Sequence, residues 1–269
     1  MPVEMIGWIA PRVSSEIIPA QGPAFSADVV AETAHIHEDA GFDRVLIGYF
    51  SDAPDGFILG AHAAHVTECL SFLLAHRPGF VSPTVAARKL ATFDQLCGGR
   101  LAVHIISGGR EAEQAMDGDY VDHGGRYRRS EEYVEVLRRI WTASTPFDHE
   151  GEFYKFDRAY SDVKCAQKPH IPIYGGGGSD AAVELLSPGL DTFMLWGEPL
   201  KDTAAFMDRV RRAAGGRPIN FSLSTRPILA ETDDKAWDRA REILFKITER
   251  TGGGANPKNR TAENVGSQR

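Results

Sequence analysis

Residues 169–186 read PHIPIYGGGGSDAAVELL, and the architecture of the chain is most visible in this stretch. A short apolar strand ends at Tyr174, four glycines and Ser179 follow, and an apolar-periodic run that predicts a helix begins at Asp180. Glycines let a backbone approach a bulky anion, and a helix N-terminus offers N–H groups without intrahelical partners. The turn therefore predicts a phosphate site; the alternative is a flexible turn without a ligand. The stretch lacks the lysine of a P-loop and the glycine spacing of a dinucleotide-binding turn.

The composition points to an ordinary soluble protein with one large core. The chain has 269 residues, of which 42% are hydrophobic and 25% charged, and its net charge is −7. An acidic chain disfavours nucleic-acid or membrane-surface binding, because both partners attract basic faces. Three cysteines without a Cys-x-x-Cys pair suggest reduced thiols. No signal peptide or membrane span is visible, so we expect a cytoplasmic protein without a metal site.

Strands and helices alternate along the sequence. Apolar segments predict strands at 5–10, 44–48, 70–75, 101–106, 172–174, 192–196 and 220–228. Helices are predicted at 26–40, 55–66, 83–96, 130–141, 200–214 and 233–249, with another beginning at Asp180. This order predicts an α/β fold, a (β/α)₈ TIM barrel formed by one domain over residues 1–269. No eighth strand can be placed after residue 228, so we expect the barrel to be incomplete at its C-terminus. The polar, glycine-rich residues 250–269 predict a mobile loop.

Chemically versatile residues lie at the C-terminal ends of the predicted strands. They are Pro11-Arg12, Tyr49-Phe50, His76-Arg77, Ser107 to Gly109, Gly175 to Ser179, Trp196 and Arg226. Barrel enzymes carry their active sites at the C-terminal ends of the strands, where the following loops meet. The pattern therefore favours an enzyme over a scaffold.

Five segments together carry a family resemblance. They are AHRPGFVSPTVAAR at 75–88, TFDQLCGGRLAVHIISGG at 92–109, DGDYVDHGGRY at 117–127, the glycine turn at 174–179 and LWGEP at 195–199. The chain resembles the bacterial luciferase-like flavin monooxygenases, and within them the alkanesulfonate monooxygenase group, from about residue 5 to its last residue. The resemblance implies a luciferase-like TIM barrel whose last βα units are missing here, with residues 250–269 leading into the mobile active-site loop.

The resemblance also implies a reaction. An NAD(P)H-dependent flavin reductase would supply reduced FMN (FMNH₂), and the monooxygenase would use it with O₂ to oxygenate an organosulfonate. Carbon–sulfur cleavage would release sulfite and an aldehyde, and the enzyme would be a homo-oligomer, either a dimer or a tetramer. Ala53, Val13 and the Ser224-Thr225-Arg226 segment depart from the narrow alkanesulfonate enzymes. A sulfosugar such as sulfoquinovose fits equally well. The alternatives are a related monooxygenase acting on a sulfone, an aminocarboxylate or a hydrocarbon, and a non-catalytic flavin-binding paralogue.

The resemblance assigns residues to the flavin. Gly177, Gly178 and Ser179 match the phosphate turn, and His123 and Tyr127 match a His-x-x-x-Tyr pair that reaches the phosphate. The alternative for this pair is a helix cap at Asp122-His123 and a packed tyrosine.

Strand ends supply the remaining flavin contacts. Ala75 and His76 would lie against the flavin ring at a bulge that often carries a non-proline cis peptide; the alternative is an ordinary strand end. His104 and Ser107 would reach the polar edge of the ring, although His104 also fits a core histidine.

Three further residues are candidates for substrate chemistry. Trp196 could wall the substrate pocket or simply pack in the core. Arg226 follows a strand of small polar residues, and its forked guanidinium suits a sulfonate; the alternative is a surface ion pair. Arg12 is a second candidate of the same kind.

Overall fold

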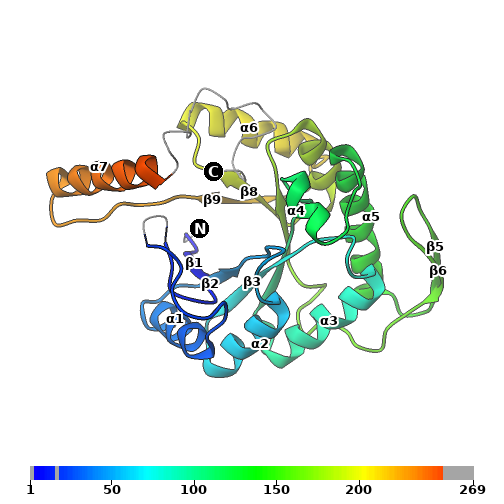
Figure 1. Ribbon diagram of the computed structural model, residues 1–269. Helices are drawn as coiled ribbons and strands as arrows, with labels where there is room; N and C mark the ends of the chain where they lie inside the picture. The colour runs from blue at the N-terminus through cyan, green and yellow to red at the C-terminus, as the bar shows by residue number, and fades with distance from the viewer. Residues whose placement is uncertain (1–2, 16–17, 251–269) are drawn as a thin grey trace.

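The computed structural model describes residues 3–15 and 18–250, and it contains one curled parallel sheet wrapped by helices (Figure 1). The strand order is β1-β2-β3-β4-β7-β8-β9, and each neighbouring pair is parallel. The strands are β1 (Ile6–Ile9), β2 (Arg44–Ile47), β3 (Ser71–His76), β4 (Leu101–Ile105), β7 (Ile173–Gly176), β8 (Thr192–Trp196) and β9 (Asn220–Ser224). This order confirms the predicted α/β fold. Within the described residues the sheet is open between β1 and β9.

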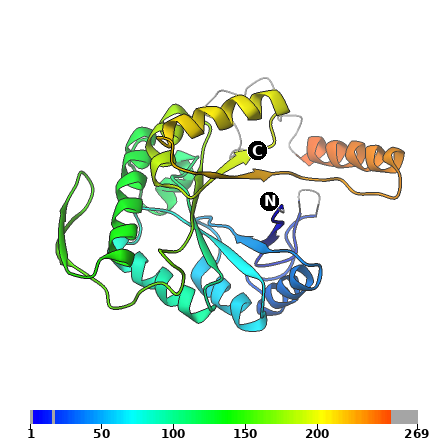
Figure 2. The same ribbon diagram turned by 180° about the vertical axis from the view of Figure 1, so that it is seen from behind.

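The helices mostly begin and end where the sequence predicts. They are α1 (Ala27–Asp39), α2 (Gly56–Val66), α3 (Pro83–Leu96), α4 (Glu111–Met116), α5 (His123–Thr142), α6 (Leu200–Ala213) and α7 (Asp233–Arg250). Side-chain caps explain several of the starts: Ser26 accepts from the Val29 amide, and Asp55 accepts from the Ile58 amide. In both views α7 lies apart from the other helices (Figures 1 and 2). No described helix has the length and apolarity needed to cross a bilayer.

Two apolar layers follow from the alternation of side chains along the strands. On β3, Phe72 and Leu74 face the helices and belong to the large core between helices and sheet. Leu73 points the other way and packs with Ala102 and Tyr174 inside the curl of the sheet. Because side chains alternate with a period of two, the parity of a strand residue tells which layer it enters. The parity therefore tells which candidate site residues face the inside of the curl and which face the helices.

Four features differ from the prediction. A two-stranded hairpin, β5 (Phe147–Glu150) and β6 (Lys155–Ala159), and the short helix α4 were not predicted. Helix α5 begins at His123, seven residues before the predicted start at Ser130. The helix after the glycine turn contains a π-helical segment, η1 (Ala182–Leu186), and ends in a 3₁₀ turn, η2 (Ser187–Gly189). The predicted mobile loop at 250–269 lies, apart from Arg250, outside the described residues.

Candidate active site

The glycine turn meets the N-terminal part of α5 at the C-terminal end of the sheet. Gly177 has a φ of +151°, a conformation that side chains rarely adopt. An ideal Cβ built on Gly177 would lie 2.6 Å from the Tyr127 hydroxyl and 2.7 Å from the Cβ of Ala182. Only glycine fits both the backbone angle and the space, so the turn brings its backbone directly against the phenol.

Two hydroxyl groups converge beside this backbone. Tyr127 is buried, and its phenol interacts with the Ser179 side chain. Burial raises the pKa of Tyr127, although the hydrogen bond to Ser179 opposes the shift. Ser179 also begins the helix that follows, because its Oγ accepts from the Ala182 amide at 3.2 Å and its carbonyl accepts from the Val183 amide at 3.2 Å. The phenol is therefore a neutral hydrogen-bond donor at neutral pH.

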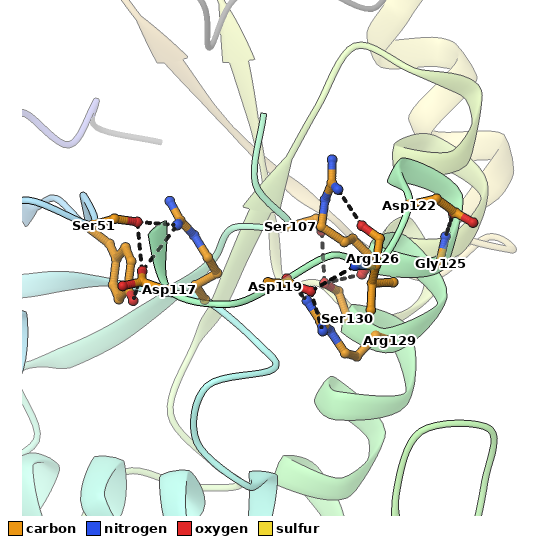
Figure 3. A network of polar contacts seen from close by, with 12 residues as sticks. Ser51, Ser107, Asp117, Asp119, Asp122, Gly125, Arg126, Arg129 and Ser130 are labelled. Atoms are coloured by element: carbon orange, nitrogen blue, oxygen red, sulfur yellow. Dashed lines mark hydrogen bonds and ion pairs between the residues drawn. The ribbon is translucent and has the colours of Figure 1, made fainter. Parts of the chain in front are cut away.

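His123 completes this group from the first turn of α5. Its ring lies 5.0 Å from the Tyr127 ring in an edge-to-face arrangement, as the spacing of four residues predicts. Asp122 caps α5 by accepting from the Gly125 amide at 2.7 Å, so the alternative interpretation of this segment, a helix cap, is present as well (Figure 3). His123, Tyr127, Gly177 and Ser179 thus lie together, with Gly178 in the same turn. Hydroxyls and turn amides of this kind fit a phosphate.

A second group faces the inside of the curl. Ala75, His104 and Tyr174 are register partners on β3, β4 and β7. His104 shares its face with Ala102, and among the described residues no hydrogen bond to its imidazole is found. Burial lowers the pKa of His104 to about 4, so the ring is neutral at neutral pH. A neutral imidazole can donate one hydrogen bond and accept another.

His76 and Ser107 point away from this interior, which corrects their predicted place. His76 is 4% exposed and lies among the helices, with its Nε2 2.7 Å from the Tyr133 hydroxyl. Burial, and secondarily Lys89, lowers the pKa of His76 to about 4. The Ser107 hydroxyl lies 2.9 Å from the Ser130 hydroxyl, on the α5 side (Figure 3). Both residues have the strand parity of the helix-facing layer, so their side chains do not reach the interior.

The bulge expected at Ala75 and His76 is absent as well. Strand β3 keeps regular register with β4 through both residues. The cis peptide bond among the described residues is Lys168–Pro169, so the Ala75–His76 bond is trans. Ala75 is therefore an ordinary, buried strand residue whose small side chain faces the curl.

The three substrate candidates lie along the same edge of the sheet. Trp196 is the last residue of β8, is half-buried, and shares its face with Met194, which packs inside the curl. Arg226 is exposed and lies two residues beyond the end of β9. Arg12 is half-buried and lies three residues beyond the end of β1. All three residues are thus at C-terminal strand ends, as predicted, although Arg226 is on the surface.

Sequence reasoning missed a buried ionic cluster at the ends of β2 and β3. Arg77 is 3% exposed; it donates to Glu113 at 2.8 Å and to Ser51 at 3.2 Å, and its guanidinium lies 4.4 Å from the centre of the Tyr49 ring. Asp117 accepts from the hydroxyls of Ser51 at 2.7 Å and Tyr49 at 3.2 Å (Figure 3). Glu113 lies within α4 and Asp117 directly follows its last residue, so the cluster fixes this helix over the strand ends. Their spacing of four residues was the available signal, because it places both on one helical face.

A cavity lies next to this cluster. Its volume is about 400 Å³, and Arg129 and Asp119 form an ion pair of 2.5 Å in its wall. Burial opposes ionisation of Asp119, but the hydrogen bonds from Arg129 hold its pKa below the usual value. Gly79, with a φ of +110°, passes directly over the Arg129 guanidinium, which a Cβ at Gly79 would meet at 2.5 Å. One part of the cavity wall is therefore an ion pair whose charges neutralise each other, and Gly79 lies directly over it.

Comparison with known proteins identifies the family. The model of the family described as luciferase-like monooxygenase matches residues 5–268. A riboflavin lyase solved with modified FMN and riboflavin shares 19% identity and a TM-score of 0.77 over 90% of this chain and 66% of its own. EDTA monooxygenase from Chelativorans sp. BNC1 shares 19% identity and a TM-score of 0.75 over 95% of this chain and 67% of its own.

A third solved structure extends the similarity. The oxygenating constituent of 3,6-diketocamphane monooxygenase from Pseudomonas putida, in complex with FMN, shares 18% identity and a TM-score of 0.74 over 98% of this chain and 84% of its own. The chain thus spans about two thirds of the length of the first two structures and more of the third. These similarities show a common fold, the curled parallel sheet of the luciferase-like barrels. The chain belongs to the luciferase-like monooxygenase family.

Proposed function

We propose that this chain binds reduced FMN and acts, with O₂, as a flavin-dependent monooxygenase. The observation that carries the proposal is the meeting of the Tyr127 hydroxyl, the Ser179 hydroxyl and the Gly177 backbone in one small space. A phosphate is a dianion that several such donors bind together. Two of the similar solved structures are described as holding FMN or a modified FMN, which supports this choice of phosphate ligand.

One group of residues would bind the phosphate of the cofactor, and a second group would contact its flavin ring. Tyr127, Ser179 and the amides of the glycine turn would bind the phosphate, with His123 beside them. Ala75 has a small side chain on the interior face and would leave room for the flavin ring, and His104 would offer it a neutral imidazole. When bound, reduced FMN would supply the activation of O₂, while the protein excludes water and orients the reactants.

For the substrate we propose an organosulfonate, either an alkanesulfonate or a sulfosugar such as sulfoquinovose. Arg226, and secondarily Arg12, would bind the sulfonate, because a guanidinium fork matches its oxygens, and Trp196 would wall the pocket. The reaction would consume R–CH₂–SO₃⁻, O₂ and FMNH₂ and yield R–CHO, HSO₃⁻, FMN and H₂O. An NAD(P)H-dependent flavin reductase would return FMN to its reduced form.

We place the enzyme in the cytoplasm as a homo-oligomer. The second candidate function is oxygenation of an aminocarboxylate, because a similar structure is described as an EDTA monooxygenase. Product analysis separates the two candidates, since only the first releases sulfite.

The test is a coupled assay with purified protein, NADH, a flavin reductase, FMN and a panel of sulfonates. Sulfite and aldehyde should appear in equal amounts. Arg226→Ala should lower sulfite release at low sulfonate concentration by roughly 30- to 1000-fold, the usual effect of removing one positioned electrostatic donor. Arg226→Lys should also lose much of the activity, because an ammonium lacks the fork.

Arg211→Ala is the matched control for charge. Arg211 is an exposed arginine of α6 that pairs with Asp208 at 2.8 Å, so its loss should not affect sulfite release. Normal sulfite release by Arg226→Ala would remove Arg226 from the site. Oxygenation of an aminocarboxylate without sulfite release from any sulfonate would favour the second function.

A further inference from the structure

Two aromatic rings lie half-exposed at the C-terminal ends of the first two strands. Trp8 on β1 is 44% exposed, and Phe50, three residues beyond the end of β2, is 47% exposed. The ring centres are 6.3 Å apart and the ring planes are inclined by 58°, so the two rings form an open corner rather than a flat stack. Aromatic rings left accessible beside a candidate site form a surface that another apolar group can cover.

The alternation of side chains on β1 places Trp8 inside the curl. Ile6 packs with the interior cluster that contains Leu73, and Trp8 is two residues farther along the same strand. Residues two apart on a strand share a face, so the Trp8 ring points into the curl. A Cβ built on Gly7, between them, would instead meet the His37 ring of α1 on the helix side.

The corner adjoins the position proposed for the flavin ring. Gly48 and Ala75 directly follow the last register pair of β2 and β3, so they are neighbours on adjacent strands. A Cβ built on Gly48 would lie 2.5 Å from Cη2 of Trp8 and 3.1 Å from Cε2 of Phe50. The two rings therefore occupy the space above Gly48, one strand away from Ala75.

The strand that carries Trp8 also leads to a cation. Arg12 lies four residues after Trp8, is half-buried, and makes no ion pair with the residues that the structure describes. Gly48 and Ala75, beside the rings, have no side-chain donor or acceptor. The exit of β1 thus combines a positive charge with an apolar wall, which suits a small anion that carries a hydrocarbon chain. A hydroxylated chain would lose its hydration against this wall without gaining hydrogen bonds in return.

We propose that Trp8 and Phe50 bind the hydrocarbon part of the substrate and so select a sulfonate with an apolar chain over a sulfosugar, an inference that rests on the proposed function. The sulfonate would bind to an arginine while its chain lies in the corner between the rings. Each methylene group buried there should raise kcat/KM about fourfold, mainly through KM.

The first arm of the test measures sulfite release from ethanesulfonate, butanesulfonate, hexanesulfonate and sulfoquinovose in the coupled assay. For the wild type, kcat/KM should rise at least about tenfold from ethanesulfonate to hexanesulfonate, and sulfoquinovose should be a poorer substrate than butanesulfonate. Trp8→Ala should lose most of this rise. Trp237→Ala is the matched control, because Trp237 is an exposed tryptophan of α7, and it should keep the whole rise.

Gly48→Ala is a second variant that leaves both rings in the chain. Its new methyl group would displace the tips of the two rings, and Gly48 does not have the positive φ that would strain an alanine. This variant should also lose most of the rise. Thermal melts check that each variant is folded, so a variant that fails to fold is replaced by the other.

The second arm measures binding without turnover, by calorimetry in the presence of oxidised FMN. The wild type should bind hexanesulfonate at least about tenfold more tightly than ethanesulfonate, and Trp8→Ala or Gly48→Ala should lose most of this preference.

The outcomes separate this inference from the proposed function. Sulfite release by the wild type that is independent of chain length, or best with sulfoquinovose, would overturn the inference and leave the proposed function standing. Folded Trp8→Ala and Gly48→Ala variants that keep the whole rise would do the same. A wild type that releases no sulfite from any sulfonate would overturn the proposed function; equal binding of ethanesulfonate and hexanesulfonate would then overturn the inference as well.

Discussion

Replacing Gly177 by alanine should lower the stability of the fold and weaken flavin binding. Two separate features of this position oppose a side chain: its backbone angle and its close neighbours. The φ of +151° is unfavourable for alanine by roughly 1–3 kcal/mol. The new Cβ would also lie 2.6 Å from the Tyr127 hydroxyl and 2.7 Å from the Ala182 Cβ, and such overpacking costs about 1–3 kcal/mol. We expect the melting temperature to fall by roughly 5–15 °C. Displacing the phenol should weaken binding of reduced FMN at least about tenfold.

Gly216→Ala is the matched control for the backbone term. Gly216 also has a positive φ, +80°, but a Cβ there would meet nothing within 4 Å. Gly216→Ala should lower the free energy of unfolding by only about 1–2 kcal/mol and should leave the flavin affinity unchanged. Thermal melts and anaerobic fluorescence titrations of both variants give the comparison. If Gly177→Ala had the same melting temperature as Gly216→Ala and bound FMN as tightly as the wild type, the close approach of the turn to Tyr127 would be refuted.

Three further predictions follow from individual contacts. Tyr127→Phe should weaken the binding of reduced FMN by about 1.5–3 kcal/mol, because one hydrogen bond to a charged group is lost. Unchanged affinity for reduced FMN in a fluorescence titration would exclude the phenol from the site. The pKa of His76 is about 4 in the folded chain and near 6.5 in the unfolded chain, so the unfolded state binds more protons between these values. The free energy of unfolding should therefore fall by up to about 3 kcal/mol from pH 6.5 to pH 4. Chemical denaturation of His76→Asn should show a smaller fall over the same pH range, and an equal fall would contradict the low pKa of His76. Arg77→Met should lower the free energy of unfolding by about 3–5 kcal/mol, because it removes the buried partner of Glu113, which would keep only the exposed Arg110 at 3.4 Å. Adding Glu113→Gln should recover part of this loss; a normal melting temperature for the single variant would show that the cluster does not hold α4.

Short-range sequence patterns were enough to predict most of the helices and strands. Helix α3 begins at Pro83 and ends before Gly98 and Gly99, which both adopt positive φ angles, and these limits are visible in the sequence. The β5–β6 hairpin was not predicted because its order comes from a distant residue. Glu132 on α5 accepts from the amides of Phe153 and Tyr154, and no local pattern reveals such a contact.

The candidate site was predictable where spacing alone decides the geometry. His123 and Tyr127 share one side of α5 because they are four residues apart, and the glycine turn reaches them from β7. The facing of strand residues was harder to predict. His76 and Ser107 each lie one residue from a position that faces the curl, and a shift of one residue exchanges the two faces of a strand.

The most direct measurement is an anaerobic titration of the wild-type protein with reduced FMN and reduced riboflavin side by side. If Tyr127, Ser179 and the Gly177 turn bind a phosphate, FMN should bind at least about tenfold more tightly than riboflavin, since a charge-assisted hydrogen bond contributes roughly 1.5–3 kcal/mol. The preference should disappear in Tyr127→Phe/Ser179→Ala. Equal affinities for the two flavins in the wild type would contradict the phosphate site.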